Sequence, residues 1–509
     1  MPRICKYGRN EKTLKCNSKP KPKRICKYGR NEKTLKCNSK PKKSMKESMK
    51  KSMKESMKES MKESMKESMK ESMKESMKEE LKNICSDSSF CISFGIQSEN
   101  IKKYFNNFID FSLAKPNEIK VIGQKSVNGF ILEIPYENNG YEAYAALKSS
   151  LKEHSDNLIY EGVVGKFINE QSKKYPCFIE TYGVGHYSDK ELYNNLLSGK
   201  NITGKDLLET LKLKEVKLNE KEINKFGNSC RGAQYNCVLV QHLKNIKSIQ
   251  DIVMEKYYLD SFFNMEFINY MFQVYCPLDN IKNNFTHYDL HYANAFVYYP
   301  SEKKDKYIKM IYSYNDTDIE FKTAGIVKII DYGRSYFNVD ERVNSSKISK
   351  IICSDSRCNP LCGHNYGYSF QPNEQNYIIS SKRNISHDLR LLNEIKIMTN
   401  EIITGTNTNK LFEKLVYGSG MPMVDGKENP KNHYGTPEII NGGYPNKILN
   451  VSDAHKMLKE MMQSEIFKKM NDQEFEGMTE MGTLQVFVES NKSMKYTSQS
   501  EYNNNKNDK

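Results

Sequence analysis

The sequence predicts an α+β protein that carries a basic arm of repeats at its N-terminus. Short strand-like runs and longer helical patterns alternate after residue 84. The 509 residues are enough for two lobes with appendages. The net charge of +15 is confined to residues 1–80, which leaves the rest of the chain neutral. A basic arm favours nucleic acid, acidic proteins or anionic membrane surfaces as partners.

The composition also indicates the compartment. No apolar run approaches the ~18 residues of a membrane-spanning helix, and the first residues do not form a signal peptide. We therefore expect a soluble intracellular protein without a membrane span. In that setting the thirteen cysteines are expected to be free thiols or metal ligands rather than a disulfide framework.

The arm has two parts, residues 1–43 and residues 44–80. The first contains two nearly identical 21-residue units, shown by the pairs Cys5/Cys26 and Cys16/Cys37. Each unit suits a small hairpin that needs a disulfide, a metal or a partner to be stable; a disordered basic tail is the alternative. The second part repeats Ser-Met-Lys-Glu, which predicts a solvated, helix-prone spacer, because its Met stripe rotates around a 3.6-residue helix.

The globular body begins near residue 84. Phe90–Leu113 has an aromatic-rich helical pattern, and Ile119–Ile134 reads as strand, turn and strand. Gly123, Ser126 and Gly129 would form the loop between these strands. Such a loop lets backbone N–H groups approach phosphates, although an ordinary hairpin would look the same.

A lysine and a helical carboxylate follow this hairpin. Lys148 ends the strand-like run Tyr144–Lys148, and Ser155–Asn157 caps a helix that runs to about residue 172. Glu161 lies on the apolar face of this helix and is expected to orient Lys148. Glu170, on the more polar side, is the alternative.

The remaining segments complete the outline. Residues 177–182 and 237–241 read as two further strands, separated by a polar insertion at about 186–235. Residues 488–509 are rich in Asn, Lys and Ser and are predicted to be a disordered tail.

Three polar residues carry the chemistry. Asp289 and Asn294 stand five positions apart between an apolar helical run and a strand-like run, and Asp331 ends a β-branched run 37 residues after Asn294. Phosphoryl transfer uses such a trio: one Asp orients the acceptor hydroxyl, while an Asn and another Asp hold Mg²⁺ at the nucleotide phosphates.

These motifs resemble those of the protein-kinase superfamily. His287–Leu290 with Asn294 is similar to H-R-D-L-x-x-x-N, Asp331–Gly333 to D-F-G, and Tyr144–Lys148 to the V-A-I-K strand. The resemblance implies a two-lobed kinase-like fold. Its small antiparallel β lobe would span residues 84–245, and its larger, mainly helical lobe residues 246–487.

The resemblance also implies a role for each residue. Asp289 would be the catalytic base, with Asn294 and Asp331 as Mg²⁺ ligands, and Asp388 would steady the backbone of the catalytic loop. The implied ATP contacts are the phosphate clamp, the glycine loop and the backbone of the hinge: Lys148, Glu161, Gly123, Ser126, Gly129, Gln241 and Leu243.

A narrower resemblance concerns viruses. Ser155–Glu161 and Tyr175–Phe178 are similar to serine/threonine kinase-like proteins of giant DNA viruses, and the units in residues 1–43 resemble two-cysteine adaptor modules of large DNA viruses. This implies a protein substrate and a partner protein recruited by the modules, with nucleic-acid contact by residues 1–43 as another option. The expected location is the host cytoplasm, at the viral factory, or the virion.

Several departures from the family pattern leave other functions open. Tyr288 replaces the family's Arg, His291 stands where a Lys is usual, and no A-P-E follows Gly333. An aminoglycoside- or choline-kinase-like enzyme for small molecules is therefore an alternative. A pseudokinase scaffold is a further one, disfavoured because Lys148, Asp289 and both proposed metal ligands are present.

A cysteine cluster lies in the segment that follows. Three Cys and one His within twelve residues could form a tetrahedral Zn²⁺ site, and a loop of unpaired thiols is the alternative. The four residues are Cys353, Cys358, Cys362 and His364.

Overall fold

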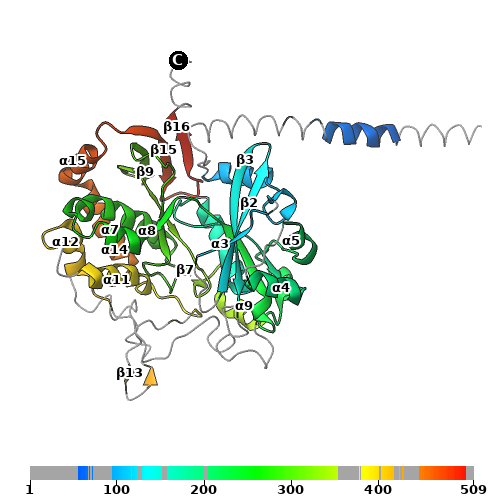
Figure 1. Cartoon of the computed structure of the whole chain (residues 1–509). Helices are drawn as coiled ribbons and strands as arrows, with labels where there is room; N and C mark the ends of the chain where they lie inside the picture. The colour runs from blue at the N-terminus through cyan, green and yellow to red at the C-terminus, as the bar shows by residue number, and fades with distance from the viewer. Residues whose placement is uncertain are drawn as a thin grey trace, which may run out of the picture. The chain divides into compact units, whose positions relative to one another are not determined.

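A computed structural model describes residues 94–115, 117–123, 129–151, 158–198, 204–352, 378, 380–399, 403–417, 423–424, 427–428 and 446–499, together with 56–66, 68 and 72. The chain divides into two compact units, Met1–Glu75 and Ser76–Lys509. In the first, residues 56–66 form an exposed helix within the Ser-Met-Lys-Glu repeats, as their helix propensity predicts. The second unit has an α+β fold (Figure 1).

The first half of this unit is built on a five-stranded antiparallel sheet. Its strands lie in the order β1 (Lys120–Ile122), β2 (Gly129–Asn138), β3 (Tyr141–Ser150), β5 (Asn236–Gln241) and β4 (Thr181–His186). The predicted strand, turn and strand are β1 and β2, which confirms that part of the sequence analysis. The strand expected at 177–182 begins only at Thr181.

Helix α3 (Leu158–Ser172) packs directly against this sheet. Two glycines on α3 make the close approach possible. A Cβ atom added to Gly162 would lie 2.0 Å from Cγ1 of Val184, and one added to Gly165 would lie 2.0 Å from Oγ1 of Thr181. Any larger residue would push α3 away from β4.

An aromatic cluster from the segment before β1 packs against buried residues of the same sheet. The helix expected over 90–113 is shorter in the structure, because α2 (Ile96–Tyr104) is followed by left-handed residues at 106–108 and a 3-10 turn at Phe111–Leu113. The aromatic rings in this segment are nevertheless buried. Burial rather than helical periodicity therefore explains the pattern.

The insertion between β4 and β5 is part of the same core. It forms α4 (Lys190–Leu197), α5 (Gly204–Thr210) and α6 (Glu220–Ile223). Leu192, Leu196, Leu207 and Leu211 are buried against the sheet residues. The insertion therefore stabilises the sheet, a role that its polar composition did not suggest.

Helices dominate much of the second half. The central one is α8 (Phe267–Ile281), which follows a π-helical turn at Phe262–Glu266 and is almost entirely buried. Helix α7 (Ile249–Glu255) precedes it and contacts β6 and β8. The helices that pack against α8 or follow it in the chain are α9 (Ser345–Ile352), α11 (Arg390–Thr399), α12 (Asn407–Lys414), α14 (Val451–Gln463) and α15 (Glu465–Glu474).

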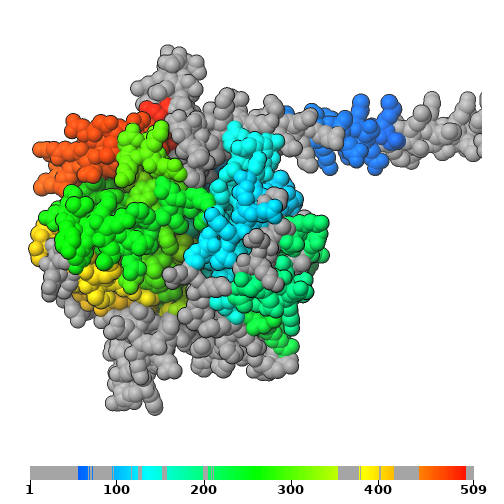
Figure 2. All heavy atoms as spheres, viewed as in Figure 1, coloured from blue at the N-terminus to red at the C-terminus, as the bar shows by residue number. Residues whose placement is uncertain are grey.

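A second sheet in this half was not predicted. It has the order β10 (Asp318–Thr323), β9 (Lys306–Ser313), β15 (Thr479–Phe487) and β16 (Lys495–Ser498), and β9 and β15 run parallel. The prediction of a disordered tail from residue 488 is wrong for Lys495–Ser498, because this segment pairs with β15. In Figure 2 the C-terminal elements and the β2–β3 hairpin occupy separate regions of the visible face.

Short strand pairs place the polar motifs together. Strand β8 (Ala295–Tyr298) lies between β11 (Ile326–Ile329) and β6 (Ile246–Ser248), and Ile329 faces Ala295. Antiparallel pairing therefore brings Asn294, just before β8, next to Asp331, just after β11. A second pair joins β7 (Phe285–Thr286) to β12 (Tyr336–Phe337), and β13 (Met423–Val424) pairs with β14 (Lys427–Glu428). None of the described helices is long and apolar enough to cross a membrane.

Candidate active site

A lysine from the sheet bridges two carboxylates from other elements. Lys148 lies on β3, opposite Ile131 of β2 and Val238 of β5. Its Nζ lies 2.8 Å from Oε2 of Glu161 on α3 and 2.9 Å from Oδ1 of Asp331. Glu170, the alternative partner, instead pairs with Lys173. The structure thus brings together three of the residues selected from the sequence.

Asp331 is held in an unusual backbone conformation. Its φ is +67°, in the left-handed region that non-glycine residues seldom adopt. The residues on both sides are fixed: Ile330 N donates to Asn294 O at 3.0 Å, and the Tyr332 hydroxyl donates to Ile329 O at 2.9 Å. Burial raises the pKa of the Asp331 carboxyl, but the nearby Lys148 ammonium outweighs this and brings the pKa to about 2. Asp331 is therefore ionised at neutral pH.

The loop between β7 and β8 is fastened by a buried carboxylate. Asp388, in the 3-10 turn His387–Leu389, accepts hydrogen bonds from the backbone N–H groups of His287 at 2.8 Å and Tyr288 at 2.9 Å. These bonds hold Tyr288 at a φ of +64°. Burial raises the pKa of Asp388 to about 7, although the two amide donors oppose the shift. The role expected for Asp388 thus has the required contacts.

His287 connects the two halves of the site. Its Nε2 donates to Ile330 O at 2.9 Å, and its Nδ1 accepts from the backbone N–H of Asp289 at 3.3 Å. The ring is fully buried, and this burial lowers its pKa to about 4. A neutral imidazole therefore ties the loop that carries Asp289 to the backbone beside Asp331.

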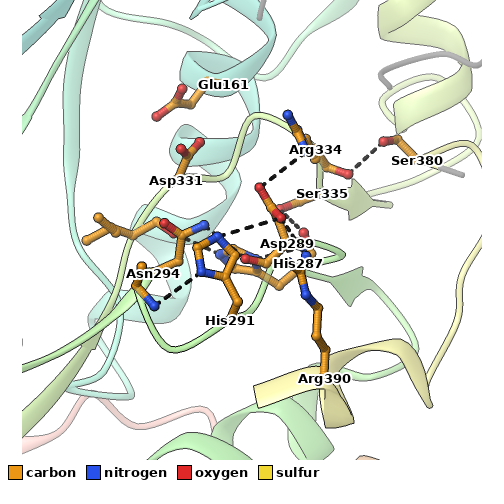
Figure 3. Close-up of polar contacts among 12 residues, drawn as sticks. Glu161, His287, Asp289, His291, Asn294, Asp331, Arg334, Ser335, Ser380 and Arg390 are labelled. Carbon is orange, nitrogen blue, oxygen red and sulfur yellow. Dashed lines mark hydrogen bonds and ion pairs between the residues drawn. The ribbon is translucent and has the colours of Figure 1, made fainter. Parts of the chain in front are cut away.

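Asp289 itself faces two arginines (Figure 3). NH1 of Arg390 lies 2.8 Å from Oδ1, and NH1 of Arg334 lies 3.6 Å from Oδ2. Nε2 of His291 lies 3.8 Å from Oδ1, and burial lowers the pKa of that imidazole. Sequence reasoning assigned no role to either arginine. The available signals were their positions, directly after Gly333 and two residues after Asp388.

Asn294 completes the loop. Its Nδ2 donates to the backbone carbonyl of Asp289 at 2.9 Å. Because the amide nitrogen is used in this bond, the side-chain carbonyl oxygen is the atom that Asn294 can offer to a cation. Two kinds of oxygen ligand, the Asn294 amide and the Asp331 carboxylate, therefore stand on adjacent backbone segments.

The expected nucleotide contacts are described in part. Gly123, with a φ of +67°, follows β1, and Gly129 begins β2, whereas Ser126 lies outside the described residues. Gln241 ends β5, with its N–H donating to Glu180 O at 2.8 Å, and the half-buried Leu243 follows. The described ones lie at or just beyond the ends of strands β1, β2 and β5 in the sheet that carries Lys148.

An ionic cluster beside this segment was not anticipated. Glu133 of β2 is buried and faces Ala146 of β3 in the register of the sheet. Its carboxylate contacts Nε2 of His242 at 2.9 Å and also contacts the Lys244 ammonium. Burial would raise the pKa of Glu133, but the Lys244 and His242 contacts lower it. The cluster ties the end of β5 to β2.

Two predictions concern residues outside the described part of the chain. These are the Zn²⁺ hypothesis for Cys353, Cys358, Cys362 and His364, and the paired modules of residues 1–43. Within the described ranges, no group of three or more His, Cys, Asp or Glu side chains could hold a metal ion. The described cysteines Cys177, Cys237 and Cys276 are buried free thiols, as predicted, whereas Cys230 forms a disulfide and corrects the thiol prediction at that position.

Comparison with known proteins adds no identification. No protein-family model matches the chain, and no curated protein matches it. The site combines a carboxylate next to cationic groups, an amide and a carboxylate side chain on adjacent backbone segments, and an ammonium anchored by a buried carboxylate.

Proposed function

We propose that Ser76–Lys509 contains a two-lobed, protein-kinase-like phosphotransferase that uses ATP and Mg²⁺. The observation that carries the proposal is the double contact of Lys148, at 2.8 Å to Glu161 and 2.9 Å to Asp331. An anchored ammonium beside a metal-binding carboxylate is what phosphoryl transfer needs to position a polyphosphate. The five-stranded antiparallel sheet followed by a largely helical region supports the same proposal.

The residues have distinct tasks in this proposal. Asp289 orients the acceptor hydroxyl and takes its proton, while Lys148, held by Glu161, contacts the phosphates. His287 and Asp388 position the loop through the hydrogen bonds given above. The backbone of Gln241 and Leu243 would pair with the adenine base, and Gly123, Ser126 and Gly129 would lie over the phosphates.

The donor set fits Mg²⁺. Mg²⁺ prefers oxygen ligands and keeps several waters or phosphate oxygens, so that one or two protein ligands are sufficient. Asn294 and Asp331 would hold the ion, and the low pKa of Asp331, about 2, keeps its carboxylate charged. When bound, the ion would neutralise charge on the phosphates.

The preferred acceptor is a serine or threonine of a protein, as the resemblance to viral kinase-like proteins implies. The arm of residues 1–43 would then recruit a partner, and the enzyme would act in the host cytoplasm, at the viral factory, or in the virion. One observation favours a small-molecule kinase as the second candidate: His291 lies 3.8 Å from Asp289, two residues beyond it, where protein kinases usually have a Lys.

The test is phosphoryl transfer from labelled ATP with Mg²⁺. The full chain is offered a protein mixture and, separately, a panel of amino-alcohols and aminoglycosides. Asp289→Asn should abolish transfer to any acceptor. Asp316→Asn, an exposed Asp in the β9–β10 turn, is the matched control and should retain it. Full activity of Asp289→Asn would refute the proposed function, and the labelled acceptor identifies the substrate class.

A further inference from the structure

Two buried tyrosine hydroxyls bond to backbone groups beside the candidate active site. The Tyr332 hydroxyl donates to Ile329 O at 2.9 Å and accepts from the backbone N–H of Ile179 at 3.0 Å. The Tyr160 hydroxyl donates to Ser335 O at 2.7 Å. Both tyrosines are buried, and the low dielectric of the interior strengthens such hydrogen bonds.

These bonds connect elements that carry different parts of the site. Tyr160 lies on α3 directly before Glu161, and its bond ties that helix to the segment that starts at Asp331. Ile179 lies in the connection between α3 and β4, so the Tyr332 bonds tie that connection to the same segment. The two hydroxyls therefore fix the carboxylate of α3 relative to that of Asp331.

The relative position of the two carboxylates matters because Lys148 contacts both. Its Nζ lies 2.8 Å from Glu161 and 2.9 Å from Asp331, and it keeps both contacts only while the two elements stay in place. In kinase-like enzymes this Lys–Glu pair and the metal-binding Asp must both be in position, and phosphorylation of the enzyme commonly brings this about.

The position of the family's arginine holds a third tyrosine of this kind. Tyr288 is fully buried, and its hydroxyl donates to Lys382 O at 2.7 Å. An arginine at this position would offer a cation to a phosphorylated side chain, whereas a neutral phenol does not. The contact made at this position therefore needs no phosphate.

We propose that Tyr160 and Tyr332 are positioning residues, whose hydroxyls hold α3 and the Asp331 segment in the catalytic arrangement without phosphorylation of the enzyme. This inference rests on the proposed function and describes the regulation of that site. Neither hydroxyl touches the reacting atoms. Each acts through the backbone that carries the two carboxylates.

The experiment removes one hydroxyl at a time and keeps the ring. Phenylalanine is the residue that D-F-G has at this position, so Tyr332→Phe compares the two motifs directly. In the full chain, Tyr160→Phe and Tyr332→Phe should each lower kcat about five- to ten-fold, because small misplacements of catalytic groups are costly. KM for ATP should change less than about two-fold, since the contacts of the adenine base are unaltered. The acceptor is the one that the labelled-ATP assay identifies.

The matched control is another buried tyrosine. The Tyr312 hydroxyl has no hydrogen-bond partner within the described part of the chain, so Tyr312→Phe should keep the wild-type kcat and KM. Urea midpoints show whether each variant is folded under the assay conditions. If one of the two positioning variants does not fold, the other carries the test.

Binding gives a readout that does not depend on transfer. Calorimetry measures the affinity for a non-hydrolysable ATP analogue with and without Mg²⁺. The gain in affinity on adding Mg²⁺ should fall about three-fold in Tyr332→Phe, because Asp331 is less well placed to hold the ion, and should be unchanged in Tyr312→Phe. A merely structural role of Tyr332 would lower the urea midpoint without changing this gain.

The outcomes separate the two proposals. Wild-type protein freed of phosphate by a broad-specificity phosphatase, as checked by mass spectrometry, should keep its initial rate of transfer. Loss of that rate, or wild-type kcat and Mg²⁺ dependence in the folded Phe variants, would overturn this inference and leave the phosphotransferase proposal standing. Absence of transfer by the untreated wild type to every protein and small molecule would overturn the phosphotransferase proposal, and this inference with it.

Discussion

The bridge made by Lys148 should have a measurable energetic signature that does not depend on catalysis. Lys148→Met removes the only cation that contacts both Glu161 and Asp331 among the described residues. It leaves two carboxylates close together, and the Glu161 side chain is only 4% exposed. An ionised carboxylate in such surroundings is destabilising unless it is paired.

The size of the effect follows from the burial of the three groups. Removing one partner of a fully buried pair costs about 3–5 kcal/mol. Lys148 and Asp331 are 23% and 29% exposed, which places the expected loss for Lys148→Met near the lower limit, at about 3 kcal/mol. Glu161→Gln keeps the Lys148–Asp331 contact and should cost about 1 kcal/mol.

The double variant is the decisive measurement. In Lys148→Met/Glu161→Gln the more deeply buried of the two uncompensated carboxylates, Glu161, is gone and only the more exposed Asp331 is left without Lys148. The total loss should therefore be about 2 kcal/mol less than the sum of the single losses. Urea unfolding of the full chain at pH 7 measures all three variants. Lys205→Met is the control, because its 3.8 Å contact with Glu209 joins two exposed side chains and should contribute little. Strictly additive losses would refute the argument.

Three other predictions follow from the same structure. The pKa of His287 is about 4 in the native state and 6.5 in the unfolded chain. Its burial as a neutral imidazole is therefore compatible with full stability above pH 6.5, and the free energy of unfolding falls as the pH drops towards 4. Wild-type protein should lose about 3 kcal/mol more than His287→Gln over this window in urea titrations, and parallel curves would contradict this. Asp388→Ala leaves the buried backbone N–H groups of His287 and Tyr288 without their acceptor and should lower the free energy of unfolding by about 2–3 kcal/mol. An unchanged midpoint in urea unfolding would show that these hydrogen bonds do not contribute to stability. Deleting residues 1–43 should leave nucleotide binding unchanged and abolish capture of a partner from extract; if the four cysteines of the modules can be replaced by serine without loss of capture, the arm acts only through its charge.

Local patterns were sufficient for much of the first half of the body. The β1–β2 hairpin, β3 and α3 were predicted because each has its own periodicity, turn residues or cap, and these signals act within a few residues. The carboxylate partner of Lys148 could also be selected, because helical geometry places Glu161 on the apolar face of α3. The interrupted helix at 90–113 was not predictable, because buried aromatic rings give the same pattern in a helix or in a packed loop.

The sequence by itself determined the order of the chemical motifs, the neutral body and the basic arm. Tertiary structure alone decided what surrounds Asp289. Arg390 lies 101 residues further along the chain and reaches Asp289 because Asp388 fixes the start of α11 beside the loop that carries Asp289. The parallel pairing of β9 with β15 joins segments that are even further apart. Such long-range contacts produce no periodic pattern in the sequence, because they depend on how separate elements pack and not on neighbouring residues in the chain.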